Sequence, residues 1–196
     1  MSDELSKRQR DSIEALSILL KACKEENIEF FLLAGSCLGA VRHKGMIPWD
    51  DDIDIGLKLE EYEKLQKVLP HILEGTDFAF KDCDSHPEFP RMYGKVLKGE
   101  HGVIDVFKLV PVPKSPISQR VHWFRKRLWA GMRTRKLWHP AQFPSKKARV
   151  KYEMKQLVAK PMSQLFSPQY LTNKLKSIER QYLGCETGLF SNFYSV

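Results

Sequence analysis

Four carboxylates fall within five residues, in the run DDDID at residues 50–54. Carboxylates crowded this closely repel one another, and a bound cation relieves that repulsion. In a strand, Asp52 and Asp54 lie on the same face, because successive side chains alternate between the two faces. The isoleucine between them then points into the core. This alternation predicts a strand over residues 52–57 whose polar face binds one or two hard divalent ions.

A further carboxylate, Asp105, lies in the apolar segment GVIDVF. Burying it beside valine, isoleucine and phenylalanine is costly unless it faces a polar cleft or a metal ion. A calcium loop or a solvated turn is the alternative for the first cluster, although the closing Glu of an EF-hand is absent. A hydrogen-bonded structural carboxylate is the alternative for Asp105. Taken together, the motifs favour a catalytic metal triad of Asp52, Asp54 and Asp105, with Asp50 as a further ligand, directly or through water.

Residues suited to phosphate surround these acids. Gly35 and Ser36 form a small-residue turn after an apolar strand, where backbone N–H groups can approach a phosphate. A basic run follows on the loop that leads to the acids, and a lysine lies on a later predicted strand. For the histidine and this lysine, ordinary surface positions are the alternative. The predicted substrate-binding residues are Gly35, Ser36, Arg42, His43, Lys44 and Lys95.

The elements that position these residues follow from hydrophobic periodicity. Amphipathic helices are predicted over residues 11–26 and 59–73, and further helices over residues 118–138, 145–158 and 168–183. Strands are predicted over residues 30–34, 52–57, 78–82, 91–98 and 102–109. Trp49, beside the acids, could stack on a base or pack against the core, and the core is the favoured interpretation. The order predicts an α+β, α/β-like core followed by a helical extension.

Composition bounds the remaining possibilities. The chain has 196 residues, enough for one domain with an appendage, and its four cysteines show no zinc-binding spacing. No apolar run approaches the ~20 residues of a membrane span, and the polar N-terminus lacks the apolar segment of a secretory signal. A cytoplasmic protein is expected, in contact with the inner face of the membrane at most peripherally.

Positive charge is concentrated in one stretch. Residues 106–160 contain fifteen Lys/Arg and a single acid, a local balance of +14 within an overall +8. Such asymmetry favours a surface that meets an anionic partner: a phosphorylated glycan, an anionic membrane surface or a nucleic acid. A solvated helical face is the alternative. Interleaved Trp123, Trp129 and Trp138 suit carbohydrate stacking or an interfacial helix, and equally a packed helix.

The segment FLLAGSCLGAVRHKG, continuing as MIPWDDDIDIG, resembles the LicD family of phosphocholine transferases, to which fukutin and its relatives belong. The resemblance covers about residues 30–109, and the Asp105 segment is similar to the family's later strand. It implies a nucleotidyltransferase-type mixed β-sheet flanked by helices. Residues 1–110 would form this catalytic core, and residues 111–196 a basic, aromatic-rich helical region suited to acceptor binding.

The resemblance also implies a reaction. A phospho-substituent such as phosphocholine would pass from a CDP-activated donor, CDP-choline or a CDP-polyol, to a hydroxyl of a cell-surface glycan such as lipopolysaccharide, teichoic acid or capsule. Mg²⁺ or Mn²⁺ held by Asp52, Asp54 and Asp105 would neutralise the transferring phosphates. Two alternatives remain: a nucleotidyltransferase that uses an NTP on RNA or a small alcohol, and an inactive nucleotide- or metal-binding module. The absence of an RNA-binding signature makes nucleic acid the less expected partner.

Overall fold

The computed structural model describes residues 6–137, 145–147, 149–150, 152–154, 161, 164–185 and 187–192. It divides into two compact units, each described separately below. The first, here the sheet unit, comprises Met1–Asp82, Tyr93–Val110 and Ser191–Val196. The second, here the helical unit, comprises Cys83–Met92 and Pro111–Phe190.

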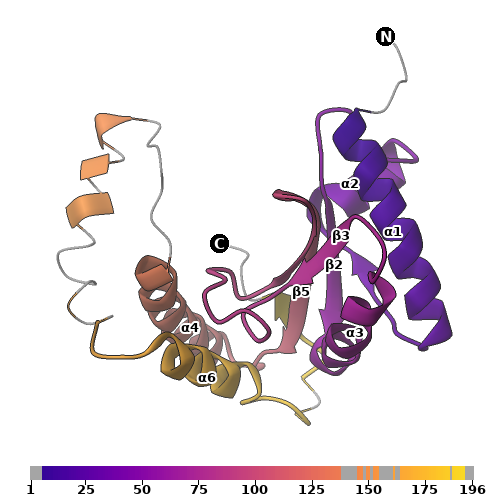
Figure 1. Ribbon diagram of the computed structural model, residues 1–196. Coiled ribbons are helices and arrows are strands. Elements are labelled where there is room, and N and C mark those ends of the chain that lie inside the picture. Colours follow the sequence, from indigo (N-terminus) through magenta and orange to yellow (C-terminus); the bar gives the residue numbers. More distant parts are fainter. Residues whose placement is uncertain are drawn as a thin grey trace. The chain divides into compact units, whose positions relative to one another are not determined.

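The sheet unit is built on a mixed sheet with the strand order β1-β2-β5-β4-β3. Strands β2, β3 and β5 of this sheet are labelled in Figure 1. Strands β2 and β5 run parallel, whereas the pairs β1–β2, β4–β5 and β3–β4 are antiparallel. A short strand, β6, also pairs with β5. The strands are β1 (Phe31–Leu32), β2 (Ile53–Lys58), β3 (Phe78–Lys81), β4 (Gly94–Lys98), β5 (His101–Pro111) and β6 (Phe190–Asn192).

Three helices accompany this sheet: α1 (Lys7–Glu25), α2 (Ala34–Arg42) and α3 (Leu59–Ile72). Helices α1 and α3 lie side by side (Figure 1) and pack against each other. The core between helices and sheet is aliphatic, because the inward positions of β2 and β5 are fully apolar. Its most buried members include Leu19, Ile55, Leu57, Leu65, Leu69, Ile104 and Val106.

These elements confirm the predicted α+β class, with a mixed sheet flanked by helices, and correct several boundaries. Helix α1 begins four residues earlier than predicted, because Ser6 and Gln9 form a reciprocal capping box at its start. The strand predicted over residues 30–34 is reduced to β1, and its Phe31 is exposed rather than buried. The strand predicted over residues 91–98 begins only at Gly94, as β4.

Two local predictions were wrong. The predicted turn at Gly35 is instead the first turn of α2, which begins at Ala34 with a positive φ of 44°. Trp49 does not pack against the core, since 78% of its surface is exposed. It lies in a turn just before the acids, edge-on to the His43 ring with the ring centroids 6.4 Å apart.

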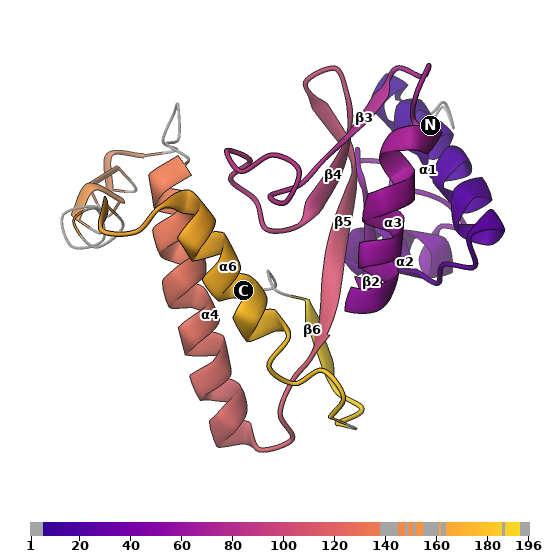
Figure 2. The same ribbon diagram turned by 60° about the horizontal axis from the view of Figure 1, so that its bottom comes forward.

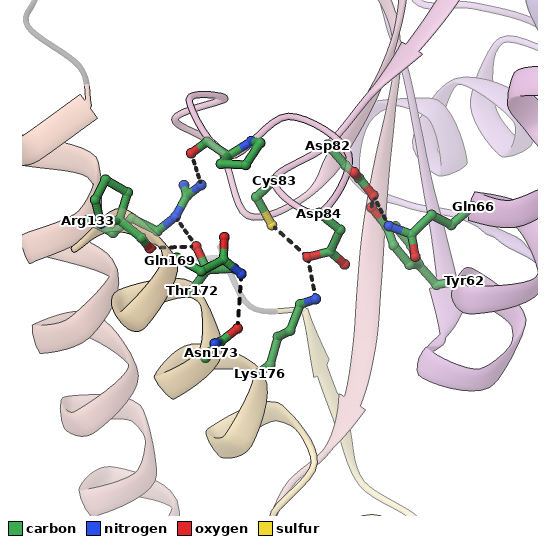
Figure 3. Close-up of polar contacts among 12 residues, drawn as sticks. Tyr62, Gln66, Asp82, Cys83, Asp84, Arg133, Gln169, Thr172, Asn173 and Lys176 are labelled. Atoms are coloured by element: carbon green, nitrogen blue, oxygen red, sulfur yellow. Dashed lines mark hydrogen bonds and ion pairs between the residues drawn. The ribbon is translucent and has the colours of Figure 1, made fainter.

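In the helical unit, α4 (Pro116–Leu137) and α6 (Pro168–Glu179) pack side by side (Figure 2). Buried Arg133 of α4 donates from Nε to the Thr172 hydroxyl at 2.8 Å and from Nη2 to the Pro87 carbonyl at 3.1 Å. Lys176 forms an ion pair with Asp84 at 2.6 Å (Figure 3). Polar contacts to α4 and α6 therefore fix the loop that contains Asp84 and Pro87.

Helix α4 confirms the helix predicted over residues 118–138. Among its residues Trp123, Phe124, Leu128, Trp129 and Met132, only Met132 is buried. The other buried side chains of α4 are His122, Lys126 and Arg133. Helix α6 confirms most of the helix predicted over residues 168–183. Trp138 and residues 155–158 of the remaining predicted helix lie outside the described residues.

Candidate metal and phosphate site

The pairing of β2 with β5 brings the predicted carboxylates together. In the parallel register, Asp54 lies directly opposite Asp105, although 50 positions separate them along the chain. Asp52 immediately precedes β2. One carboxylate oxygen from each of the three residues lies within 4.8 Å of the others. Asp50, Asp51 and Asp52 form a second, overlapping group, whose carboxylate oxygens also lie within 4.8 Å of one another.

Burial and neighbouring charges raise the pKa of two of these carboxylates, Asp52 and Asp54. Partial burial, followed by repulsion from Asp52 and Asp105, raises the pKa of Asp54 to about 6. Burial first, and then the charges of Asp105 and Asp50, also raise the pKa of Asp52. A folded protein that holds carboxylates in this state gains by adding a cation between them.

Lys95 on β4 already provides one cation at the cluster. The antiparallel register places it opposite Asp105, and its Nζ lies 2.5 Å from Asp105 Oδ1 as an ion pair. Gly102 leaves room for this side chain, because a Cβ there would come within 2.8 Å of Lys95 Nζ. Lys95, Asp105 and Asp54 thus form a polar row across the neighbouring strands β4, β5 and β2.

The donor set fits a hard divalent ion. Asp105 is nearly fully buried, and within the described part of the chain its Oδ1 has no hydrogen-bond donor other than its ion-pair partner Lys95. Mg²⁺ and Mn²⁺ favour carboxylate oxygens, whereas the described part of the chain offers no histidine or cysteine at this cluster. Asp52, Asp54 and Asp105 would hold the ion, with Asp50 beside them.

Helix α2 closes the site from the other side. The Ser36 hydroxyl accepts a hydrogen bond from the Asp54 backbone N–H at 2.8 Å, which ties the start of α2 to β2. Gly35 lies against Asp50, and a Cβ at this position would collide with the Asp50 carboxylate. Glycine is therefore required here by close approach rather than by its backbone angles.

Arg42, His43 and Lys44 lie at the far end of α2 and are exposed. Arg42 Nε donates to His43 Nε2 at 2.9 Å, and none of the three contacts the carboxylates within the described residues. Of the predicted substrate-binding residues, the structure thus brings Gly35, Ser36 and Lys95 to the acids. For Arg42, His43 and Lys44, a substrate-binding role therefore remains a prediction.

The sequence interpretation missed Gln9, which holds in place the loop that contains Asp50 and Asp51, here called the acidic loop. Its buried amide Nε2 donates to the carbonyls of Ile47 at 3.0 Å and Asp50 at 2.9 Å. One turn further along α1, the Ser12 hydroxyl donates to the Asp51 carbonyl at 3.1 Å. The Ser-x-x-Gln capping pattern at Ser6 was the available signal, since it extends the helix to include Gln9.

A mainly apolar cavity of about 180 Å³ adjoins the acids. Asp50, Asp52 and Ser36 supply its polar lining, so it opens on the same carboxylates. Its remaining lining residues come from α1, α2, β1, β2 and the loop between α2 and β2: Ile13, Leu16, Leu32, Ala40, Gly45, Met46, Ile47 and Ile53. The cavity can accommodate an uncharged or cationic group beside a metal-bound phosphate.

A mixed sheet with carboxylates on two neighbouring parallel strands, and a Gly-Ser helix start against them, is an arrangement of the nucleotidyltransferase type. The family model described as LicD/FKTN/FKRP, nucleotidyltransferase domain, matches residues 27–164. The chain belongs to this family. The match includes all the predicted site residues and α4.

Individual relatives match shorter segments. An uncharacterized protein of Rickettsia prowazekii is 46% identical over 77 residues, covering 36% of this chain and 29% of the relative. The lipopolysaccharide cholinephosphotransferase LicD of Haemophilus influenzae is 38% identical over 64 residues, 33% of this chain and 24% of that protein. The human ribitol 5-phosphate transferase FKRP is 50% identical over 41 residues, 21% of this chain and 8% of FKRP. The matched part of the chain therefore spans less than a third of the length of these relatives.

Proposed function

We propose that this chain is a metal-dependent phosphotransferase that moves a phospho-substituent from a CDP-activated donor to a hydroxyl of a glycan. The main support is the juxtaposition of Asp54 with Asp105 in the β2–β5 register, with Asp52 beside them. Membership of a family whose members include a cholinephosphotransferase and ribitol-5-phosphate transferases supports the substrate class.

Each residue of the cluster then has a role. Asp52 and Asp54 hold a Mg²⁺ or Mn²⁺ ion, which supplies charge neutralisation for the donor diphosphate. Asp105 shares that ion and accepts the proton of the attacking hydroxyl. Asp50 supports the cluster directly or through water. Gly35 and Ser36 offer hydrogen bonds to a donor phosphate.

Lys95 carries a positive charge that can pair with Asp105 and with a donor phosphate. In the structure it pairs with Asp105, the carboxylate that lacks other donors. A donor phosphate at the cluster would offer Lys95 a second anionic partner within reach of its flexible stem. Arg42, His43 and Lys44 would meet phosphates further out. The adjoining cavity would take the base or the transferred substituent of the donor.

Residues 1–110 would form the catalytic core, and residues 111–196 a basic region for the anionic acceptor. A lipopolysaccharide, teichoic acid or capsule glycan fits the fifteen Lys/Arg between residues 106 and 160. The reaction needs no covalent intermediate on the protein, because phosphoryl transfer depends on positioning and charge stabilisation.

Product release with a panel of donors tests the proposal. CDP-choline, CDP-ribitol, CDP-glycerol and the four NTPs are incubated with the chain and Mg²⁺ or Mn²⁺, with and without EDTA. Release of CMP from one CDP donor, abolished by EDTA, is expected and identifies the substituent. Pyrophosphate released from an NTP would instead assign nucleotidyl transfer. Metal binding without turnover of any donor would leave a binding module and overturn the transferase proposal.

A further inference from the structure

Helix α4 carries an apolar stripe that the described residues of the helical unit leave exposed. Ile117, Val121, Phe124 and Leu128 recur at intervals of four, three and four residues, so they form one line along the helix. Between 42% and 75% of each residue's surface is exposed. Scattered single exposed apolar residues are ordinary, whereas a line of four large ones marks an interaction surface.

This stripe is not the face that α4 uses to pack within its own unit. The buried side chains of α4 are His122, Lys126, Met132 and Arg133, and the three polar ones follow helical spacing along one face. Arg133 reaches Thr172 of α6 through it. Because each residue turns the helix by about 100°, the two lines lie on nearly opposite sides of α4. The apolar stripe therefore faces away from the contacts that hold α4 in place.

The charges beside the stripe define its partner. Arg120 and Arg127 flank it on one side and Arg125 on the other, and α4 contains seven Lys/Arg but no Asp or Glu. Trp123 lies on the same side of the stripe as Arg127, and the Arg127 guanidinium is 4.5 Å from the Trp123 ring centroid. A second copy of so basic a helix would be repelled. Apolar side chains bordered by arginines and a tryptophan instead match the boundary between acyl chains and anionic headgroups.

We propose that α4 is an in-plane membrane-surface helix that docks on an anionic lipid bilayer. Phe124, Leu128 and their neighbours in the stripe would enter the acyl boundary, while Arg120 and Arg127 contact headgroup phosphates. The contact would be peripheral, since none of the helices described is long and apolar enough to cross a membrane. It does not depend on which donor the metal site uses.

Co-flotation of the full chain with vesicles tests this docking without any enzymatic readout. One vesicle type contains phosphatidylcholine alone, and the other adds about 30% phosphatidylglycerol, an anionic fraction large enough to create a surface potential. Binding to the anionic vesicles is expected, with weaker binding as salt rises. The stripe variant Val121→Ser/Phe124→Ser/Leu128→Ser is expected to bind about tenfold less tightly or worse.

A matched control removes the same three residue types elsewhere. Val41, Phe31 and Leu20 are exposed to a similar extent on the sheet unit, and their joint replacement by Ser should leave vesicle binding unchanged. Circular dichroism verifies that both variants are folded. Arg120→Gln/Arg127→Gln should weaken binding to the anionic vesicles and reduce its salt dependence.

Three results would overturn the proposal: no wild-type binding to anionic vesicles, equal losses in the stripe variant and the control, or unchanged binding in the stripe variant. Analytical ultracentrifugation without vesicles tests the alternative that a second copy of the chain binds the stripe. If the chain self-associates and the stripe variant alone abolishes this, the stripe is a contact between copies, and the membrane assignment fails.

Discussion

Helices α3 and α4 use their apolar residues in opposite ways. In α3, Tyr62, Leu65 and Leu69 are buried in the aliphatic core, and the charged residues face solvent. In α4, three of the four buried side chains are polar, while Val121, Phe124 and Leu128 are exposed; the buried ones are His122, Lys126, Met132 and Arg133. Both helices have the same periodicity, but only α3 follows the rule that the apolar face meets the core.

The difference shows what each unit is built to do. Burying the α3 face stabilises the sheet that positions the carboxylates. Burying polar side chains in α4 is costly unless they find partners, as Arg133 does through Thr172 and Pro87. Among the described residues of the helical unit, that arrangement leaves the apolar stripe of α4 exposed.

The chemistry should reside in the sheet unit, at Asp54. The variant Asp54→Asn should lower turnover at least about a hundredfold, because it removes a charge that holds the metal and the developing phosphate charge. The free energy of unfolding without metal should not fall, since a repulsive charge is lost. Steady-state CMP release and denaturant unfolding measure the two quantities. Exposed Asp77→Asn is the control, and equal activity of the two variants would contradict the metal role.

Replacing a leucine by alanine should lower the free energy of unfolding strongly on α3 and hardly at all on α4. The variant Leu65→Ala should lower the free energy of unfolding by about 2–5 kcal/mol, because it opens a cavity in the core. The variant Leu128→Ala should change it by less than about 0.5 kcal/mol, because the side chain is exposed. Urea unfolding of both variants in the same buffer decides the matter. A large cost at Leu128 would show that its side chain is covered in solution.

Replacing one glutamine on α1 and one on α4 by alanine compares how strongly a loop is anchored in each unit. The variant Gln9→Ala should cost about 1–3 kcal/mol, because it leaves buried carbonyls of the acidic loop without a donor. The variant Gln119→Ala loses one partly buried bond, to the Pro113 carbonyl at 2.8 Å, and should cost about 1 kcal/mol. Isothermal titration with Mg²⁺ should show weaker binding only for the Gln9 variant.

The buried polar face of α4 should make the helical unit sensitive to acid. Burial, together with the nearby charges of Lys126 and Arg125, lowers the pKa of His122 to about 4 from an ordinary 6.5. The unfolded chain therefore takes up a proton first as pH falls, so the stability from neutral His122 is complete above pH 6.5. That stability is lost progressively as pH falls from 6.5 through 4.

The variant His122→Leu should reduce this loss by about 1 kcal/mol or more between pH 7 and pH 4.5. Among the described residues, neither ring nitrogen of His122 has a hydrogen-bond partner, so an apolar replacement removes a polar group without leaving another unpaired. Urea midpoints at the two pH values, with exposed His71→Gln as control, provide the measurement. An unchanged pH dependence would show that His122 is hydrated in solution.

Local patterns anticipated much of the sheet unit. The alternation of carboxylate and aliphatic residues through Ile55 predicted β2, and the spacing of Leu65 and Leu69 predicted α3 and its buried side. These predictions succeeded because both elements pack one apolar face against the core, which period-two and period-3.6 patterns report directly. In α4, the pattern predicted the helix but left the role of its apolar residues open, because hydrophobicity identifies an apolar face but not the partner that covers it.

The sequence by itself determined which groups could do chemistry: four clustered aspartates, a lone Asp105 in an apolar strand, and Gly35-Ser36 ahead of them. Only the tertiary structure decided that Asp54 lies opposite Asp105, that Lys95 pairs with Asp105, and that Gln9 anchors the acidic loop. The reason is physical. Residue type and periodicity are local properties, whereas parallel pairing joins strands distant along the chain, and its register depends on the packing of the entire core.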